Sequence, residues 1–321
     1  MYRLLRKVFP KKTRPTTYFL VRPGKNYRQV QKQLFSVIQK AMPKGSYTTI
    51  PEDEYKSEPN TISFDMFIRA TGDVLMSHGV ADKNYFFIRD EKGEYLVNRR
   101  KHLLVPGPWL KKKILNRKGI TLKPNQIHCV GWPRLDYLLE LQAEYNRENN
   151  HAEPKRKIKV LWAPTHDKRK RGPENQSTSS YPALEQWESL LQEKFDFTKA
   201  LHPRNKVVDK KPTTESLIEA DYVISDFGTI VYEAWALGKP VIFPTWLIGE
   251  RIQRYLKGSA EAYIFKHKIG LHAESIDDVI RFIEEKQGLG EDVKEFMQMY
   301  LPDEYKGRSS KRIAQLLLEL K

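Results

Sequence analysis

Short apolar runs alternate with helix-period segments along most of the chain. Runs of four to seven residues occur in "TYFLVR", "DVLMSHG", "HLLVPG" and "QIHCVG", and amphipathic segments follow the first and the last of them. The pattern restarts after residue 157 with "IKVLWAP", "DFTKALHP", "DYVISDF" and "PVIFP". Strands and helices that alternate in this way predict parallel sheets covered by helices on both faces.

The polar stretch "NRENNHAEPKRK" at residues 146–157 separates the two blocks and indicates two doubly wound domains. We place an N-terminal Rossmann-like domain at residues 1–150 and a C-terminal, nucleotide-binding one at residues 151–305. Residues 306–321 are predicted to form an amphipathic helix, whose packing partner the sequence leaves open. Its apolar positions are Ile313, Leu316, Leu317 and Leu320.

The chain is strongly basic, with 56 Lys and Arg against 40 Asp and Glu and a formal charge of +16. The excess is uneven, because no acid occurs between Glu94 and Asp136 in a segment with ten Lys and Arg. Such a surface attracts the phosphates of a membrane, a polymer or a nucleic acid, although a hydrated face is the simpler interpretation. The residues that we assign to an anionic-acceptor surface are Arg99, Arg100, Lys101, Lys111, Lys112 and Lys113.

Several classes of protein are disfavoured by the composition. No apolar stretch approaches the roughly 18 residues of a transmembrane helix, so an integral membrane protein is not expected. The basic start lacks the apolar core of a secretory signal, which favours a cytoplasmic protein. The one cysteine, Cys129, excludes an internal disulfide and a multi-cysteine zinc site. No Asp-x-Asp pair occurs, so we expect no obligatory metal ion.

The segment "DYVISDFGTIVYEAW" carries the strongest local signal for a site. Its strand ends near Ser225 and Asp226, Gly228 permits a tight turn, and Thr229 can cap the helix that follows. This places backbone N–H groups and a positive helix end at the carboxyl edge of a parallel sheet, where anions bind. Glu233 lies one turn further on and can accept hydrogen bonds from ribose hydroxyls. An ordinary strand-turn-helix remains the alternative, since the two commonest glycine-rich phosphate loops are absent.

Other strand ends carry polar and cationic groups. Thr165 and His166 follow one strand of the second block, and His202 and Arg204 follow another. In the first block, His78, Gly79 and Lys83 follow the strand "DVLM". A histidine on each side of a cleft suits general acid–base chemistry, because an imidazole titrates near neutral pH. The remaining histidines are interpreted as structural: His102, His128, His151, His267 and His272.

The order of these motifs resembles the CDP-glycerol glycerophosphotransferase family, whose members build teichoic acids and capsule polymers. The resemblance spans roughly residues 74–318 and rests on "SHGVADKNY", "VGWPRLDYL", "VLWAPTHD", "LHPRN", "ADYVISDFGTIVYEAWALGKPVIF" and "YKGRSSKRIAQLL". It implies a GT-B architecture in which two Rossmann-like domains face a cleft and the C-terminal domain holds the donor nucleotide.

The resemblance also implies roles for single residues. His78 matches the family's candidate catalytic base, and His202 matches the histidine that binds the donor phosphates. Residues 226–229 match the family's Asp-Tyr-Ser-Ser turn with departures, since Phe227 replaces the tyrosine and Gly228 the first serine. Glu233 is closer to the Glu-Ala pattern of enzymes that use sugar nucleotides. We assign donor binding to Gly79, Lys83, Thr165, His166, Arg204, Asp226, Gly228, Thr229 and Glu233.

These observations favour a transferase that moves glycerol phosphate, or a related polyol phosphate, from a CDP-activated donor. The expected acceptor is a hydroxyl of a cell-surface polymer or a lipid-linked molecule, reached from the inner face of the membrane. No cofactor is expected beyond the donor substrate. A GT-B glycosyltransferase that uses a UDP-sugar, acting on DNA or another polyanion, is one alternative. A non-enzymatic basic protein that binds nucleic acid is the other.

Overall fold

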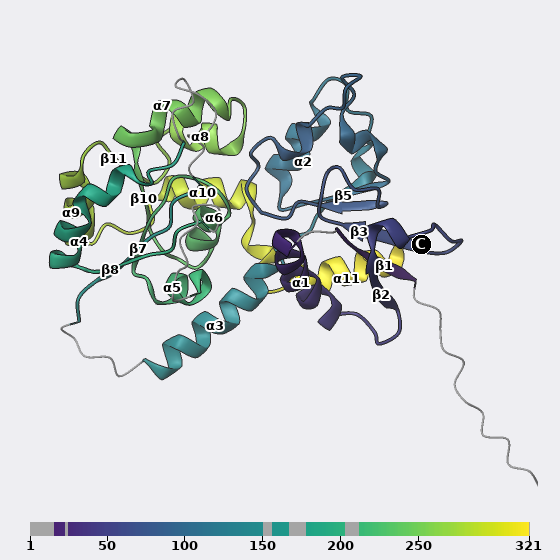
Figure 1. The fold of residues 1–321 in the computed structure, drawn as a ribbon, viewed down its shortest axis with the longest axis horizontal. Coiled ribbons are helices and arrows are strands. Elements are labelled where there is room, and N and C mark those ends of the chain that lie inside the picture. Colours follow the sequence, from purple (N-terminus) through teal and green to yellow (C-terminus); the bar gives the residue numbers. More distant parts are fainter. Residues whose placement is uncertain (1–15, 23–24, 150–155, 167–177, 203–211, 321) are drawn as a thin grey trace, which may run out of the picture.

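The computed structural model describes residues 16–22, 25–149, 156–166, 178–202 and 212–320. Figure 1 shows these residues arranged as two lobes. Each lobe contains one parallel β-sheet with helices beside it. The predicted α/β architecture with two parallel sheets is therefore confirmed. Among the described helices, none has both the length and the apolar character that a membrane span requires.

The sheet of the N-terminal lobe has six strands in the order β2-β1-β3-β4-β5-β6, and every neighbouring pair is parallel. The strands are β1 (Thr17–Val21), β2 (Tyr47–Pro51), β3 (Ile62–Asp65), β4 (Val74–Met76), β5 (His102–Val105) and β6 (Ile127–Cys129). The helices are α1 (Lys25–Lys40), α2 (Pro108–Leu115) and α3 (Arg134–Glu148). β4 is buried along its whole length, which explains its continuous apolar sequence.

The sheet of the C-terminal lobe has five parallel strands in the order β11-β10-β9-β7-β8. The strands are β7 (Lys159–Trp162), β8 (Asp196–Lys199), β9 (Tyr222–Ile224), β10 (Val241–Pro244) and β11 (Leu271–Ala273). The helices of this half of the chain are α4 (Glu188–Lys194), α5 (Thr213–Glu219), α6 (Thr229–Ala236), α7 (Thr245–Tyr255), α8 (Ala260–Lys266), α9 (Ile276–Glu284) and α10 (Glu291–Tyr300). The chain leaves β7 for β8 on one side and returns to β9 on the other, so the strand order switches between β7 and β9.

One buried apolar cluster joins the two lobes. It includes Phe64 on β3, Leu138 on α3, and Tyr232 and Tyr300 on α6 and α10. The rings of Tyr232 and Tyr300 stack with their centroids 4.6 Å apart. The lobes are therefore packed together through their cores near these helices.

The last helix, α11 (Ser309–Glu319), returns to the N-terminal lobe and packs against α1 and α3. Of its predicted apolar positions, Ile313 and Leu317 are buried and Leu316 and Leu320 are partly buried, and Ala314 is buried beside them. The carboxylate of Asp136, in the first turn of α3, accepts hydrogen bonds from the backbone N–H groups of Ser309 and Ser310 at 3.2 and 2.7 Å. The packing partner that the sequence left open is therefore the N-terminal lobe.

Candidate active site

The carboxyl ends of β7 and β9 form the switch point of the C-terminal sheet. Thr165 and His166 follow β7, and Ser225 to Thr229 follow β9. In open parallel sheets, ligands bind at such a point because the connections leave in opposite directions and open a space between them. Two of the segments that the sequence singled out in the second block therefore meet at the edge where a ligand is expected.

The turn before α6 is built on a buried carboxylate. Asp226 is fully buried and accepts hydrogen bonds from the backbone N–H groups of Thr165, at 2.8 Å, and Ser180, at 3.0 Å. Burial raises the pKa of the Asp226 carboxyl to about 6, although these hydrogen bonds favour the charged form. Gly228 has φ of +109°, which favours glycine, and α6 begins at Thr229. Asp226 therefore holds the turn before α6 against the segments of Thr165 and Ser180.

Two residues of the loop after β4, in the N-terminal lobe, approach this turn closely. A Cβ atom on Gly79 would lie 2.7 Å from Oγ1 of Thr229, so only glycine allows this approach. The Nζ atom of Lys83 lies 4.9 Å from the centroid of the Phe227 ring. A Cβ atom on Gly228 would lie 3.2 Å from the same Nζ atom. The structure thus brings the Gly79 and Lys83 segment of one lobe against residues 227–229 of the other.

Two predicted histidines of the C-terminal lobe lie together. The rings of His166, after β7, and His202, after β8, have their centroids 4.9 Å apart. Both are partly exposed at the carboxyl edge of the sheet. Arg204 lies outside the described residues. The pair can present N–H donors and positive charge to an anion bound at this edge.

His78, the candidate base, is exposed and packs against two aromatic rings of its own lobe. Phe67 stacks on the imidazole at 5.2 Å between centroids, and Tyr85 contacts it edge-on at the same distance. Because these rings leave the imidazole exposed, His78 can reach a substrate while its orientation is restricted.

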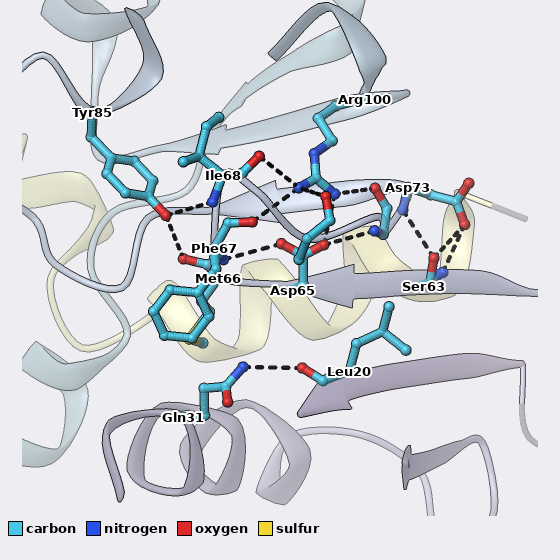
Figure 2. Close-up of polar contacts among 12 residues, drawn as sticks. Leu20, Gln31, Ser63, Asp65, Met66, Phe67, Ile68, Asp73, Tyr85 and Arg100 are labelled. Carbon is cyan, nitrogen blue, oxygen red and sulfur yellow. Dashed lines mark hydrogen bonds and ion pairs between the residues drawn. The ribbon is translucent and has the colours of Figure 1, made fainter. Parts of the chain in front are cut away.

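The loop that carries Phe67 is held by a buried ion pair, which Figure 2 shows in close-up. The carboxylate of Asp65 lies 2.7 Å from the Arg100 guanidinium and accepts hydrogen bonds from the N–H groups of Phe67 and Gly72. The guanidinium also donates to four backbone carbonyl oxygens, those of Phe67, Ile68, Ala70 and Gly72. Tyr85 fixes the same loop, since its hydroxyl donates to the Met66 carbonyl and accepts from the Ile68 N–H. These hydrogen bonds therefore fix the conformation of the loop that carries Phe67, which packs against His78.

Glu233 contacts the other lobe in this structure. Its buried carboxylate accepts hydrogen bonds from Nε1 of Trp132, at 2.8 Å, and from the guanidinium of Arg134, at 2.8 and 3.0 Å. Arg134 also donates to the hydroxyl of Thr214. The contact fastens α6 to the start of α3. Ribose binding by Glu233 stays a prediction. It requires the carboxylate to accept hydrogen bonds from the ribose hydroxyls in addition to these donors or in place of them.

The basic segment does not form one surface. Arg100 is buried in the ion pair described above, so its assignment to an anionic-acceptor surface was wrong. Arg99 and Lys101 precede β5, which places them at the amino edge of the sheet, opposite the edge where His78 lies. Lys113 bonds Asp82 at 2.5 Å and Asn84 at 2.8 Å, whereas Lys112 is exposed and Lys111 partly exposed on α2. Only α2 therefore offers cations from this set near the junction of the lobes.

Three residues of this region were not assigned to the site from the sequence. Phe67 and Tyr85 support His78, and Glu261 on α8 accepts hydrogen bonds from the backbone of Asp82 and Lys83. Glu261 is 178 or more residues away from these partners, so local spacing cannot reveal the contact. Among the described residues, no group of three or more His, Cys, Asp or Glu side chains is arranged to hold a metal ion.

Solved structures identify the fold. The wall teichoic acid polymerase TagF aligns with a TM-score of 0.63 and 15% identity over 96% of this chain and 89% of its own in one structure. A TagF variant soaked with CDPG gives 0.61 and 15% over 97% and 90%. The UDP-GlcNAc 2-epimerase of Neisseria meningitidis, bound to UDP-GlcNAc, gives 0.53 and 14% over 94% and 100%. The chain therefore has a fold of the GT-B type, as predicted.

The family follows from a sequence model. The model of CDP-glycerol:poly(glycerophosphate) glycerophosphotransferases matches residues 70–319, which is more than half of the chain. The chain belongs to this family, and the predicted resemblance is confirmed. A search of curated protein sequences returned no match.

Proposed function

We propose that this member of the family transfers glycerol phosphate, or a closely related polyol phosphate, from a CDP-activated donor to an acceptor hydroxyl. The observation that carries the proposal is the junction of the lobes, where the segment of His78 and Gly79 meets the turn that starts α6. One side of this junction offers a candidate base, and the other offers a helix N-terminus, which favours phosphate. Family membership supports the CDP-linked donor.

In the proposed reaction, the acceptor hydroxyl attacks the β-phosphorus of the CDP-linked donor. His78 takes the hydroxyl proton, a new P–O bond forms, and the bond to the bridging oxygen breaks. CMP leaves with the electron pair of that bond. The N–H groups at Gly228 and Thr229, together with His166, His202 and Arg204, stabilise the charge of the phosphates. Such electrostatic stabilisation is commonly the largest contribution to catalysis.

We extend the proposal to the metal requirement, the cofactors and the acceptor. Cationic side chains and the α6 N-terminus take the place of a metal ion, so transfer should survive treatment with a chelator, and no cofactor is needed. The acceptor is a hydroxyl of a phosphate-bearing polymer or of a lipid-linked molecule. Exposed lysines such as Lys112 draw the protein to the anionic inner surface of a membrane.

A UDP-sugar donor is the second candidate. The GT-B fold shared with the UDP-GlcNAc 2-epimerase and the Glu-Ala sequence at Glu233 favour it. The contacts of Glu233 with Trp132 and Arg134 weaken the second of these arguments, because they already use the carboxylate that would bind the ribose. The net charge of +16 suits DNA as an acceptor in this case, or as the ligand of a protein without enzymatic activity.

A panel of nucleotides separates these candidates. Thermal unfolding is measured with CDP-glycerol, CDP-ribitol, CMP, UDP, UDP-sugars and duplex DNA, since a ligand of the folded state raises the melting temperature. We expect the largest shift with CDP-glycerol or CDP-ribitol, and CMP release when an acceptor is added. A shift with UDP-sugars and none with CDP-polyols would favour the glycosyltransferase. DNA binding without any nucleotide binding would favour the non-enzymatic protein.

The role of His78 is tested by His78→Ala. Transfer should fall by about 10²–10⁴-fold, the usual contribution of a general base, whereas the Kd of CDP-glycerol stays within about twofold. His267→Ala is the matched control, because His267 is exposed just after the end of α8 and is not assigned to the site. Loss of donor binding in His78→Ala, or full transfer activity, would reject the base assignment.

A further inference from the structure

The loop after β4 is bonded to the lobe opposite its own. Tyr300 of α10 donates its hydroxyl hydrogen to the Val80 carbonyl at 2.7 Å. The backbone N–H of Ala260 donates to the Asp82 carboxylate at 2.9 Å, and the Asn84 side chain donates to the Lys257 carbonyl at 3.1 Å. Residues 80–84, here named the base loop because they follow His78 and Gly79, therefore contact the C-terminal lobe at several points.

Glu261 is the centre of these contacts. Its carboxylate accepts from the N–H groups of Asp82, at 3.0 Å, and Lys83, at 2.8 Å, and from the hydroxyl of Tyr232 at 2.8 Å. Only 1% of Glu261 is exposed. Hydrogen bonds to a buried carboxylate are stronger than those between neutral groups, so this residue is the main anchor of the base loop.

The base loop adopts a conformation that needs such an anchor. Lys83 and Asn84 have φ of +42° and +55°, in the left-handed region that residues other than glycine rarely adopt. At the start of this stretch, the successive N–H groups of Asp82 and Lys83 point toward one carboxylate. A backbone of this kind persists only when its surroundings hold it in place.

The same contacts place two carboxylates side by side in the interior. Asp82 is 1% exposed, and its pKa is raised by burial and, to a smaller extent, by the charge of Glu261. Lys113 compensates part of this charge through its bond to Asp82. Apolar residues could join the lobes at a lower cost in desolvation, so a stabilising role alone explains this arrangement poorly.

We propose that Glu261 is a positioning residue, which fastens the base loop to the C-terminal lobe and so holds His78 at a fixed place opposite the α6 N-terminus. The His78 segment is then held by both lobes. It follows β4 of the N-terminal lobe, and Glu261 of the C-terminal lobe binds the residues after it. The approach of Gly79 to Thr229 depends on the same bonds. The catalytic part of this inference rests on the proposed function.

The test combines amide hydrogen exchange with kinetics in the full chain. In Glu261→Gln, the amide group keeps one acceptor oxygen. Its NH₂ group faces at least one of the three groups that donate to Glu261, which are the N–H groups of Asp82 and Lys83 and the hydroxyl of Tyr232. We expect faster exchange at the amides of Asp82 and Lys83, a kcat for transfer lowered about 10- to 100-fold, and a much smaller change in the Kd for CDP-glycerol. Glu284→Gln is the matched control, because Glu284 pairs only with Lys194 in the described residues and lies on the surface of the same lobe.

A double variant separates positioning from general destabilisation. If Glu261 acts through His78, Glu261→Gln should lower the remaining rate of His78→Ala by less than twofold, since the two losses are not additive. Glu261→Asp, which keeps the charge, should recover part of the rate. Unchanged amide exchange in Glu261→Gln, an unchanged kcat despite faster exchange, or fully additive losses would each overturn the inference.

Failure of the proposed function gives a different result. A folded wild-type protein that neither binds nor turns over CDP-glycerol contradicts the proposed function. The exchange measurement needs no substrate, so it still decides whether Glu261 fastens the base loop. Unchanged protection of Asp82 and Lys83 in Glu261→Gln would overturn the inference in that case as well.

Discussion

Asp226 shows how a single buried residue links the turn at the site to the pH dependence of stability. Burial raises the pKa of its carboxyl in the folded protein to about 6, against 3.8 for the unperturbed group. The folded state therefore binds more protons than the unfolded state between about pH 4 and pH 6. The contribution of this group to stability is complete below pH 4 and is lost as the pH rises through 6.

The variant Asp226→Asn should remove this dependence. We expect the unfolding free energy of the wild type, relative to that of the variant, to fall by about 3 kcal/mol between pH 4 and pH 7, since one pKa unit corresponds to about 1.4 kcal/mol. Denaturant unfolding at several pH values measures the difference. A difference that stays constant across this range would show that Asp226 titrates as it does in the unfolded chain.

Single residues were the level at which the sequence was least informative. Some contacts involve residues at strand ends, which the sequence marks. They are the turn at Gly228, the pairing of His166 with His202 and the approach of Gly79 to Thr229. The burial of Arg100 is not marked in this way, because its partner Asp65 belongs to another strand and nothing in a run of basic residues marks one of them as internal. Such long-range pairs depend on tertiary packing and are invisible to local patterns.

At the scale of elements, most of the strands that were predicted lie in apolar runs, and β8, with one buried residue of four, is the exception. β1, β4, β5 and β6 and the strands from β7 to β10 coincide with the runs read from the sequence. β2 and β11 escaped because they contribute few buried side chains: no residue of β2 is buried, and Ala273 is the one buried residue of β11. β3 escaped because two of its four buried residues, Ser63 and Asp65, are polar and are satisfied by tertiary hydrogen bonds.

The contact between the loop after β4 and the start of α6 can be tested through protein stability. Gly79→Ala should lower stability by about 1–3 kcal/mol, because the new methyl group would overlap Oγ1 of Thr229. Thr229→Ala in the same chain should recover most of this loss by removing that atom. Thermal unfolding of the single and double variants measures the coupling.

Gly288→Ala is the control for this experiment, since a Cβ atom there meets nothing within 4 Å. It should change stability by less than about 1 kcal/mol, and in the stabilising direction if at all. Equal effects of the Gly79 and Gly288 substitutions, or additive effects of the Gly79 and Thr229 substitutions, would mean that the two segments do not touch.

At the scale of the whole molecule, the chain returns from the C-terminal lobe to the N-terminal lobe before α11, which packs against α1 and α3. Asp136 lies in the first turn of α3 and binds the first N–H groups of α11, so one carboxylate serves the positive ends of two helices. Asp136→Ala should destabilise the protein by about 2–3 kcal/mol, since buried N–H groups would lose their acceptor. Denaturant unfolding measures the loss. Asp303→Ala, which removes an exposed carboxylate near α11, should have little effect, and a similar loss in both variants would contradict this role.

The central claim is that the diphosphate of the donor binds at the turn before α6, opposite His78. A structure of the His78→Ala variant with CDP-glycerol tests it most directly, because this variant should bind the donor without consuming it. The account predicts diphosphate oxygens within about 3 Å of the N–H groups of Gly228 or Thr229, and the β-phosphorus facing residue 78. A diphosphate bound far from this turn would contradict the account.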